Sequence, residues 1–144
     1  MPNVFVYGTL LVPELMQVVS GGDYESAEAI AHGYARSRLA GRVYPGIAAA
    51  AGSQVPGRIY LSLTEEALRR LDYFEGPEYI RDTLEVVLQD GSRVPAETYI
   101  VPAEKRSLLT GEVWGIDSFR ACDYRGFLDR AREIMRSYAA GGQQ

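Results

Sequence analysis

The clearest periodic pattern lies in the middle of the chain, where apolar residues recur three and four positions apart. An α-helix turns by about 100° per residue, so this spacing gathers them on one stripe. Thr64 is a typical N-cap at the start of the run, and Gly76, which a proline follows, is a typical stop. The pattern predicts a helix over residues 65–75, whose apolar stripe consists of Ala67, Leu68, Leu71 and Phe74.

Glu75 falls on the same stripe, where packing favours hydrocarbon. Burying an ionised carboxylate is costly, and the negative end of the helix dipole also disfavours the charge. Both effects raise the pKa of a carboxyl group towards the range of a general acid/base. The alternative is a structural glutamate that reaches solvent or pairs with a nearby cation, for which Arg81 is the candidate. The helix pattern alone leaves both interpretations open.

Runs of alternating or β-branched residues predict strands on both sides of this helix. The stronger runs lie at residues 4–7, 58–63, 83–88 and 94–101, and weaker ones at 27–31 and 34–39. The weaker pair is interrupted near His32-Gly33, and Asp90-Gly91 predicts a hairpin turn between the last two strands. Residues 44–47 carry a turn signal that leads into a featureless alanine run at 48–51.

Two further helices are expected, a short one over residues 14–19 and a final one over 124–138. We interpret the apolar stripe of the final helix as core contact and its arginine-rich side as solvated surface. Residues 102–117 look irregular, with Trp114 covering one end of the core. Because several strands follow one another without helices between them, the order predicts an α+β fold with a largely antiparallel sheet, open or closed.

The segment Tyr7-Gly8-Thr9-Leu10 joins the first strand to the first helix. A strand, a glycine-containing turn and a helix start form a geometry that aims backbone N–H groups at an anion. The segment has one glycine and no following lysine, so it is not a phosphate-binding P-loop. The alternative is a tight turn that needs Gly8 for backbone reasons alone.

Composition narrows the function classes. The chain has 144 residues, of which 47% are hydrophobic and 24% charged, as in one ordinary globular domain. A net charge of −4 without a basic cluster argues against a nucleic-acid partner, and no apolar run suggests a membrane partner or a signal peptide. Cys122 and His32 are the only residues of their kinds. They predict a reducing, cytoplasmic setting and leave little for a zinc site or a catalytic triad.

Five ordered blocks carry a resemblance to the γ-glutamylcyclotransferase-like proteins. They are residues 6–10, 44–47, 55–60, 71–76 followed by Tyr79 and Arg81, and 96–100. The resemblance implies a small closed mixed/antiparallel β-barrel with peripheral helices and a pocket at one end. The length of the chain predicts a single domain, over residues 1–139, and the last residues, 140–144, are expected to form a flexible tail.

The resemblance further implies a reaction that converts a γ-glutamyl amide, either a γ-glutamyl amino acid or a γ-glutamylamine, into 5-oxoproline and a free amine. Glu75 matches the family's acid/base, and no metal or cofactor is implied. The substrate-binding residues are then Tyr7, Gly8, Thr9, Leu10, Tyr79 and Tyr99. The partner is the small-molecule substrate, and nothing in the pattern predicts its amine part or the oligomeric state.

Two other functions stay under consideration. The same pocket could belong to a non-catalytic binding protein for a small amino-acid-like metabolite. Glu75 could also act with Asp72 or Glu78 as the carboxylate pair of a glycosidase. The second alternative is disfavoured because a barrel this small leaves little room for a sugar-binding cleft.

Overall fold

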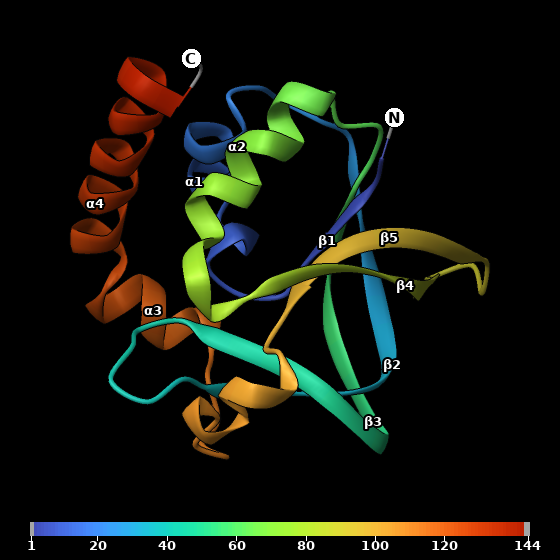
Figure 1. Cartoon of the computed structure of the whole chain (residues 1–144). Helices are drawn as coiled ribbons and strands as arrows, with labels where there is room; N and C mark the ends of the chain where they lie inside the picture. Colours follow the sequence, from blue (N-terminus) through green and yellow to red (C-terminus); the bar gives the residue numbers. More distant parts are fainter. Residues whose placement is uncertain (1, 143–144) are drawn as a thin grey trace.

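The computed structural model describes residues 2–142 and shows a closed five-stranded barrel flanked by helices (Figure 1). The strands are β1 (Val4–Val6), β2 (Ser26–Arg38), β3 (Pro45–Tyr60), β4 (Ile80–Leu88) and β5 (Arg93–Ile100). Around the barrel their order is β1-β3-β2-β4-β5. Every pairing is antiparallel except that of β1 with β5, which is parallel and closes the barrel. The predicted closed mixed barrel is confirmed.

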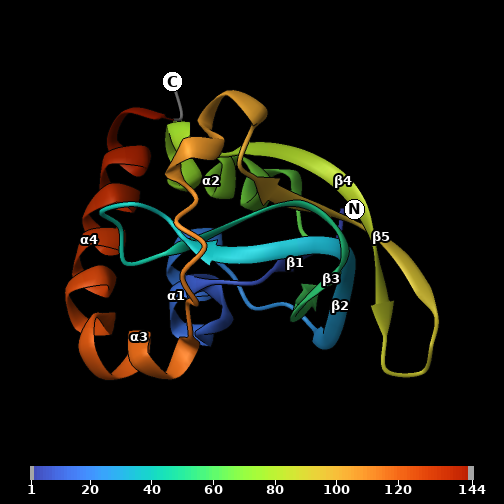
Figure 2. The same ribbon diagram turned by 90° about the horizontal axis from the view of Figure 1, so that it is seen from below.

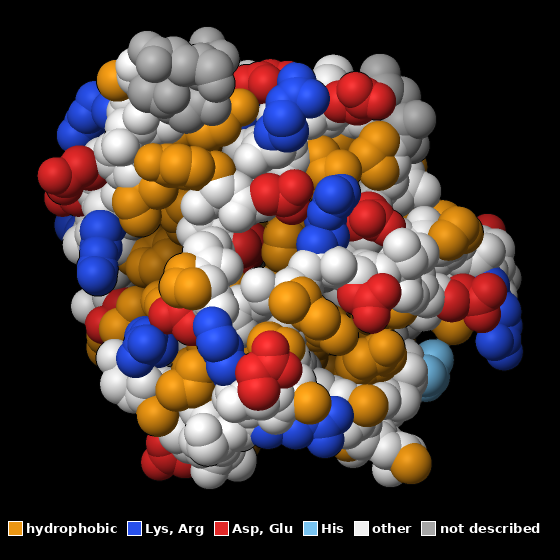
Figure 3. Space-filling view, viewed as in Figure 1, with side chains coloured by type: hydrophobic (Ala, Val, Ile, Leu, Met, Phe, Trp, Pro, Cys, Tyr) orange, Lys and Arg blue, Asp and Glu red, His pale blue; other side chains and the backbone are white. Residues whose placement is uncertain are grey.

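The longer helices gather on one side of the barrel, with α4 outermost (Figures 1 and 2). They are α1 (Pro13–Ser20), α2 (Glu65–Glu75), α3 (Ile116–Cys122) and α4 (Tyr124–Ser137). Short 3-10 turns occur at Thr9–Leu11, Gly76–Glu78 and Ala103–Leu108, and a π-helical turn occurs at Tyr138–Gly142. On the face seen in Figure 3, acidic and basic side chains are interspersed. Across residues 2–142, each helix is too short or too polar to cross a lipid bilayer.

The α2 helix has the boundaries that its sequence predicts. The Thr64 hydroxyl accepts a hydrogen bond from the Ala67 N–H at 3.0 Å, as an N-cap does. Ala67 and Leu71 are buried on the predicted stripe. Glu75 is the last residue of the helix, and Gly76 follows it with a positive φ of 71° that suits glycine.

Two predictions about the sheet were wrong in detail. The two runs expected at 27–31 and 34–39 form one strand, β2, and the interruption between them is a shift of its register with β3 between His32 and Tyr34. The expected turn at 44–47 and the alanine run after it instead begin β3, which starts at Pro45. Small residues carry little strand signal. At Gly46 close packing requires the small residue, since a Cβ there would lie 2.5 Å from Val101 Cγ2.

The segment expected to be irregular also contains order. Residues Ala103–Leu108 form a 3-10 helix, and α3 begins at Ile116, before the predicted final helix. Trp114 is only 2% exposed, and its indole N–H donates to the Val43 carbonyl at 2.8 Å. The tail expected at 140–144 partly overlaps the π-helical turn, and residues 143–144 lie outside the described residues.

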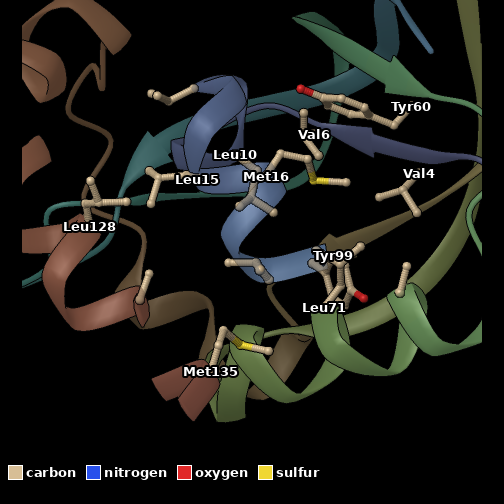
Figure 4. Packing of buried hydrophobic residues seen from close by; sticks show 14 of the residues in the cluster. Val4, Val6, Leu10, Leu15, Met16, Tyr60, Leu71, Tyr99, Leu128 and Met135 are labelled. Carbon is tan, nitrogen blue, oxygen red and sulfur yellow. The ribbon is translucent and has the colours of Figure 1, made fainter. Parts of the chain in front are cut away.

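Two hydrophobic cores meet at β1. Val4 and Val6 face the helices, where they join a cluster that includes Leu15, Met16 and Leu71 (Figure 4). Phe5, and Tyr7 just after the strand, belong instead to the cluster inside the barrel. This alternation fixes β1 from both sides, because successive side chains of a strand point to opposite faces. The loop that follows β1 is therefore held firmly in place.

Candidate active site

A cavity of about 380 Å³ lies where the loop after β1 meets the C-terminal end of α2 and the side of α4. In Figure 3 hydrophobic surface gathers between α4 and α2, the two helices that border this hollow. The lining residues come from five parts of the chain. They are Phe5, Val6, Tyr7, Gly8, Thr9, Leu10, Tyr44, Pro45, Tyr73, Phe74, Glu75, Gly76, Pro77, Glu78, Tyr79, Tyr99, Phe127, Arg130, Ala131 and Ile134.

The loop after β1 forms one wall of this pocket. Gly8 is required by contact, because a Cβ there would lie 2.8 Å from Pro45 Cγ. Within residues 2–142 the N–H groups of Gly8, Thr9 and Leu10 have no hydrogen-bond partner, since the 3-10 turn only begins here and its first bond runs from the Leu11 N–H to the Gly8 carbonyl. Three adjacent backbone donors on the pocket wall suit a bound anion.

Tyr7 anchors this loop. Its hydroxyl donates to the Tyr99 carbonyl at 2.6 Å, and its own carbonyl accepts from Arg36 Nη1 at 2.7 Å. Burial raises the pKa of the Tyr7 hydroxyl well above its ordinary value, and the charge of Glu75 raises it further. The group therefore remains a neutral hydrogen-bond donor.

Glu75 carries the one carboxyl of the pocket that is left without a partner in the described part of the chain. Neither of its oxygens takes part in a hydrogen bond or an ion pair there. The pKa of the carboxyl is raised from 4.5 to about 8, mainly by burial, then by the negative charges of Glu78 and Asp72. The side chain is partly exposed, through the pocket.

The alternative in which Glu75 pairs with Arg81 is not what the structure shows. Arg81 instead bridges two other carboxylates, with Nε 3.2 Å from Asp72 Oδ1 and Nη1 3.4 Å from Glu97 Oε1. Asp72 also accepts a hydrogen bond from the Tyr99 hydroxyl at 2.6 Å. Asp72 therefore has both a cation and a hydrogen-bond donor as partners, whereas Glu75 has neither among the described residues.

The Glu78 carboxylate, like that of Asp72, has an arginine and a tyrosine hydroxyl as partners. Its Oε2 accepts hydrogen bonds from Arg42 Nε and from the Tyr44 hydroxyl, each at 3.1 Å. Tyr79 directly follows the 3-10 turn Gly76–Glu78 and donates its hydroxyl to the Pro45 carbonyl at 2.6 Å. Burial raises the pKa of the Tyr79 hydroxyl well above its ordinary value, so it too stays a neutral donor.

A second cavity of about 330 Å³ adjoins the first and shares Glu75, Gly76, Tyr79 and Tyr99 with it. Its other lining residues are Asp72 and Arg81. Glu75 therefore stands between an apolar pocket and a polar recess. Among residues 2–142 no group of three or more His, Cys, Asp or Glu side chains is arranged to hold a metal ion.

The pocket brings together every site residue expected from the sequence: Tyr7, Gly8, Thr9, Leu10, Glu75, Tyr79 and Tyr99 all line it. The sequence analysis missed the contribution of α4. Phe127, Ala131 and Ile134 belong to the stripe interpreted as core contact, and Arg130 to the side interpreted as solvated surface, yet all four line the pocket. Periodicity identifies an apolar face but does not distinguish a core from a pocket wall.

Comparison with known proteins gives consistent similarities. Residues 4–121 match the family described as "Gamma-glutamyl cyclotransferase, AIG2-like". The chain is 34% identical over 136 residues to AIG2-like protein C of Arabidopsis thaliana, covering 94% of this chain and 78% of that protein. A solution structure of an Arabidopsis thaliana protein, 29% identical, superposes with a TM-score of 0.70 and covers 99% of this chain and 86% of that one. A structure described as "Gamma-glutamyl cyclotransferase", at 18% identity, shares the fold, with a TM-score of 0.62 over 69% of this chain and 66% of that one.

Proposed function

Because the chain belongs to the AIG2-like γ-glutamyl cyclotransferase family, we propose that it converts a γ-glutamyl amide into 5-oxoproline and a free amine, with Glu75 as the acid/base. The substrate is a γ-glutamyl amino acid or a γ-glutamylamine. The observation that carries this proposal is the unpartnered Glu75 carboxyl in the pocket, with its pKa raised to about 8. A carboxyl group with this pKa is a better proton acceptor than an ordinary glutamate and still a usable donor at neutral pH.

The reaction moves two protons from the α-nitrogen of the substrate to the nitrogen of the leaving amine. The substrate's α-ammonium gives a proton to the Glu75 carboxylate, and the freed amine nitrogen attacks the γ-carbonyl carbon of the same molecule. Glu75 passes this proton to the leaving nitrogen as the bond between that nitrogen and the γ-carbon breaks. The ring nitrogen gives up its second proton to Glu75, which passes it to the released amine, so the products are the neutral lactam of 5-oxoproline and an ammonium ion. No water is consumed, and because the attack is intramolecular, holding the substrate folded supplies much of the rate enhancement.

The raised pKa is compatible with Glu75 starting as a base. In the free protein near neutral pH most Glu75 carboxyls are protonated. A bound α-ammonium is an opposite charge beside the carboxyl, so it favours the ionised form and lowers this pKa. Substrate binding thus favours the ionised form of Glu75, which is the form that acts as a base.

The other pocket residues act in binding. The N–H groups of Gly8, Thr9 and Leu10 are suited to hold the substrate's α-carboxylate or the oxyanion that develops on the γ-carbonyl. Tyr79 and Tyr99 already donate their hydroxyls to Pro45 and Asp72, so we assign their rings to shaping the pocket and not to proton transfer. A cytoplasmic location fits the single free cysteine, Cys122.

The test is a panel of γ-glutamyl amino acids and γ-glutamylamines assayed for 5-oxoproline, with Glu75→Gln as the matched variant. Glutamine keeps the size of the side chain but cannot accept the ammonium proton. We expect the wild type to turn over at least one compound and the variant to lose about 10²–10⁴ in rate, the contribution typical of a general base. Near-wild-type turnover by the variant contradicts the role of Glu75. Binding without any release of 5-oxoproline by the wild type favours the non-catalytic metabolite-binding protein.

A further inference from the structure

The wall that α4 contributes to the pocket is largely apolar. The Phe127 ring is held among three other aromatic rings, with centroid distances of 5.4 Å to Phe119 and 6.0 Å each to Tyr44 and Phe74. Such edge-on contacts fix a ring in place. Ile134 extends the same wall along the helix. This surface suits a hydrocarbon or aromatic group of the ligand.

Arg130 lies beside this apolar wall and differs from the other lining residues. It is the one lysine or arginine among the residues that line the pocket, and its side chain is exposed. In the part of the chain that the structure describes, Arg130 makes no hydrogen bond, ion pair or cation–π contact. Arg132 on the same helix, by contrast, pairs with Glu14, and Arg42 pairs with Glu78.

A free guanidinium beside a pocket is suited to a carboxylate, which it binds through paired hydrogen bonds. The backbone donors of Gly8, Thr9 and Leu10 are available to the acyl half of the substrate, for its α-carboxylate or its developing oxyanion. The cavity of about 380 Å³ is lined by α4 as well as by the loop after β1, so it offers a second wall beyond these donors. The α4 wall is therefore left for the amine half.

Resting on the proposed function, we infer that the amine released is an α-amino acid with an apolar or aromatic side chain, which packs against Phe127 and Ile134 while its free carboxylate binds Arg130. The substrate class is thereby γ-glutamyl α-amino acids, and γ-glutamylamines without a carboxylate are poorer substrates. Phe127 and Arg130 are specificity-determining residues and take no part in proton transfer.

The experiment compares γ-glutamyl-phenylalanine with γ-glutamyl-phenethylamine, which differs only by lacking the carboxylate. The variants are Arg130→Gln, Arg130→Lys and the control Arg136→Gln. For each variant, kcat/KM is measured in the otherwise wild-type protein. The Kd is measured after Glu75→Gln has been added, so that the ligand is not turned over. Arg136 is exposed on the same helix and does not line the pocket. We expect Arg130→Gln to weaken kcat/KM and Kd about tenfold for γ-glutamyl-phenylalanine and less than about twofold for the amine analogue. Arg130→Lys restores part of the loss, and Arg136→Gln changes neither ligand.

Equal losses on both compounds, or none on either, overturn the role of Arg130, and so does a failure of both compounds to bind. If the Kd values follow the expected pattern but no 5-oxoproline forms, the proposed reaction fails and the ligand assignment stands. A wild type that binds γ-glutamyl-glycine as tightly as γ-glutamyl-phenylalanine contradicts the apolar wall, because burying a phenyl ring contributes well over tenfold in affinity.

Discussion

The unpartnered carboxyl of Glu75 makes a quantitative prediction about stability. Its pKa is about 8 in the folded protein, compared with 4.5 as an ordinary value for the unfolded chain. The folded protein therefore holds this proton more tightly, so stability decreases as pH rises from about 4.5 to 8 and the carboxyl ionises in its pocket. At about 1.4 kcal/mol per pKa unit, ionisation of Glu75 lowers the free energy of unfolding by at most about 5 kcal/mol. Because water reaches the pocket, we expect a loss in the free energy of unfolding of about 2–4 kcal/mol.

Glu75→Gln removes this titration and keeps the shape of the side chain. We expect the variant and the wild type to have nearly equal free energies of unfolding at pH 5, and the variant to be more stable by about 2–4 kcal/mol at pH 8.5. Urea unfolding followed by the fluorescence of Trp114, the single tryptophan and a buried one, measures both. Glu133→Gln, which removes an exposed glutamate of α4, corrects for the loss of one negative charge.

The reasoning is refuted if the difference between Glu75→Gln and the wild type does not change with pH. It is equally refuted if the variant is the less stable protein at pH 8.5. Either result means that the Glu75 carboxylate is well stabilised in the folded state, and the proposed acid/base then loses its raised pKa.

Further predictions concern the neighbours of Glu75 and the loop. The rate kcat/KM should rise with pH through an acid limb with a midpoint near 8, because Glu75 must ionise to act as a base. Asp72→Asn and Glu78→Gln each remove a charge that raises the pKa of Glu75, so the midpoint of the pH–rate profile should move to lower pH. The rate loss should be smaller than in Glu75→Gln. An unchanged midpoint in both variants would contradict the assigned causes of the raised pKa. Gly8→Ala places a Cβ 2.8 Å from Pro45 Cγ, so urea unfolding should show a loss of about 1–3 kcal/mol and kcat/KM should fall about 10–100-fold; a fully active and stable variant would show that the loop has room to move.

The sequence predicted the elements whose local signals are strong. Caps and periodicity predicted α2 to the residue, and alternation with an Asp-Gly turn predicted the hairpin of β4 and β5. These signals act over a few residues, so they survive without knowledge of the rest of the fold. The position of Glu75 on the helix stripe was predicted for the same reason, because it is a local property, whereas its role as the acid/base comes from the resemblance.

Features that depend on distant partners were missed. The first half of β3 consists mostly of alanines and glycines with little strand propensity, and it is a strand because β2 pairs with it along its length. Arg81 pairs with Asp72 and Glu97, and this choice is made by the packing of α2 against the sheet. The pocket wall on α4 could not be predicted, because a cavity consists of the space between elements and leaves no mark in the periodicity of any one of them.

The closure of the barrel by β1 has a consequence for how the protein acquires its pocket. Val4 pairs with Tyr60 on one side and with Glu97 on the other, and the Thr98 hydroxyl donates to the carbonyl of Phe5 across 93 residues of chain. Such distant contacts demand that long loops close before any stabilisation is gained, so folding belongs to the slow range of about milliseconds to seconds. The loop that follows β1 is positioned only once β3 and β5 have reached it. A partly folded chain therefore has no binding site, and the return of ligand binding during refolding reports the completion of the whole barrel.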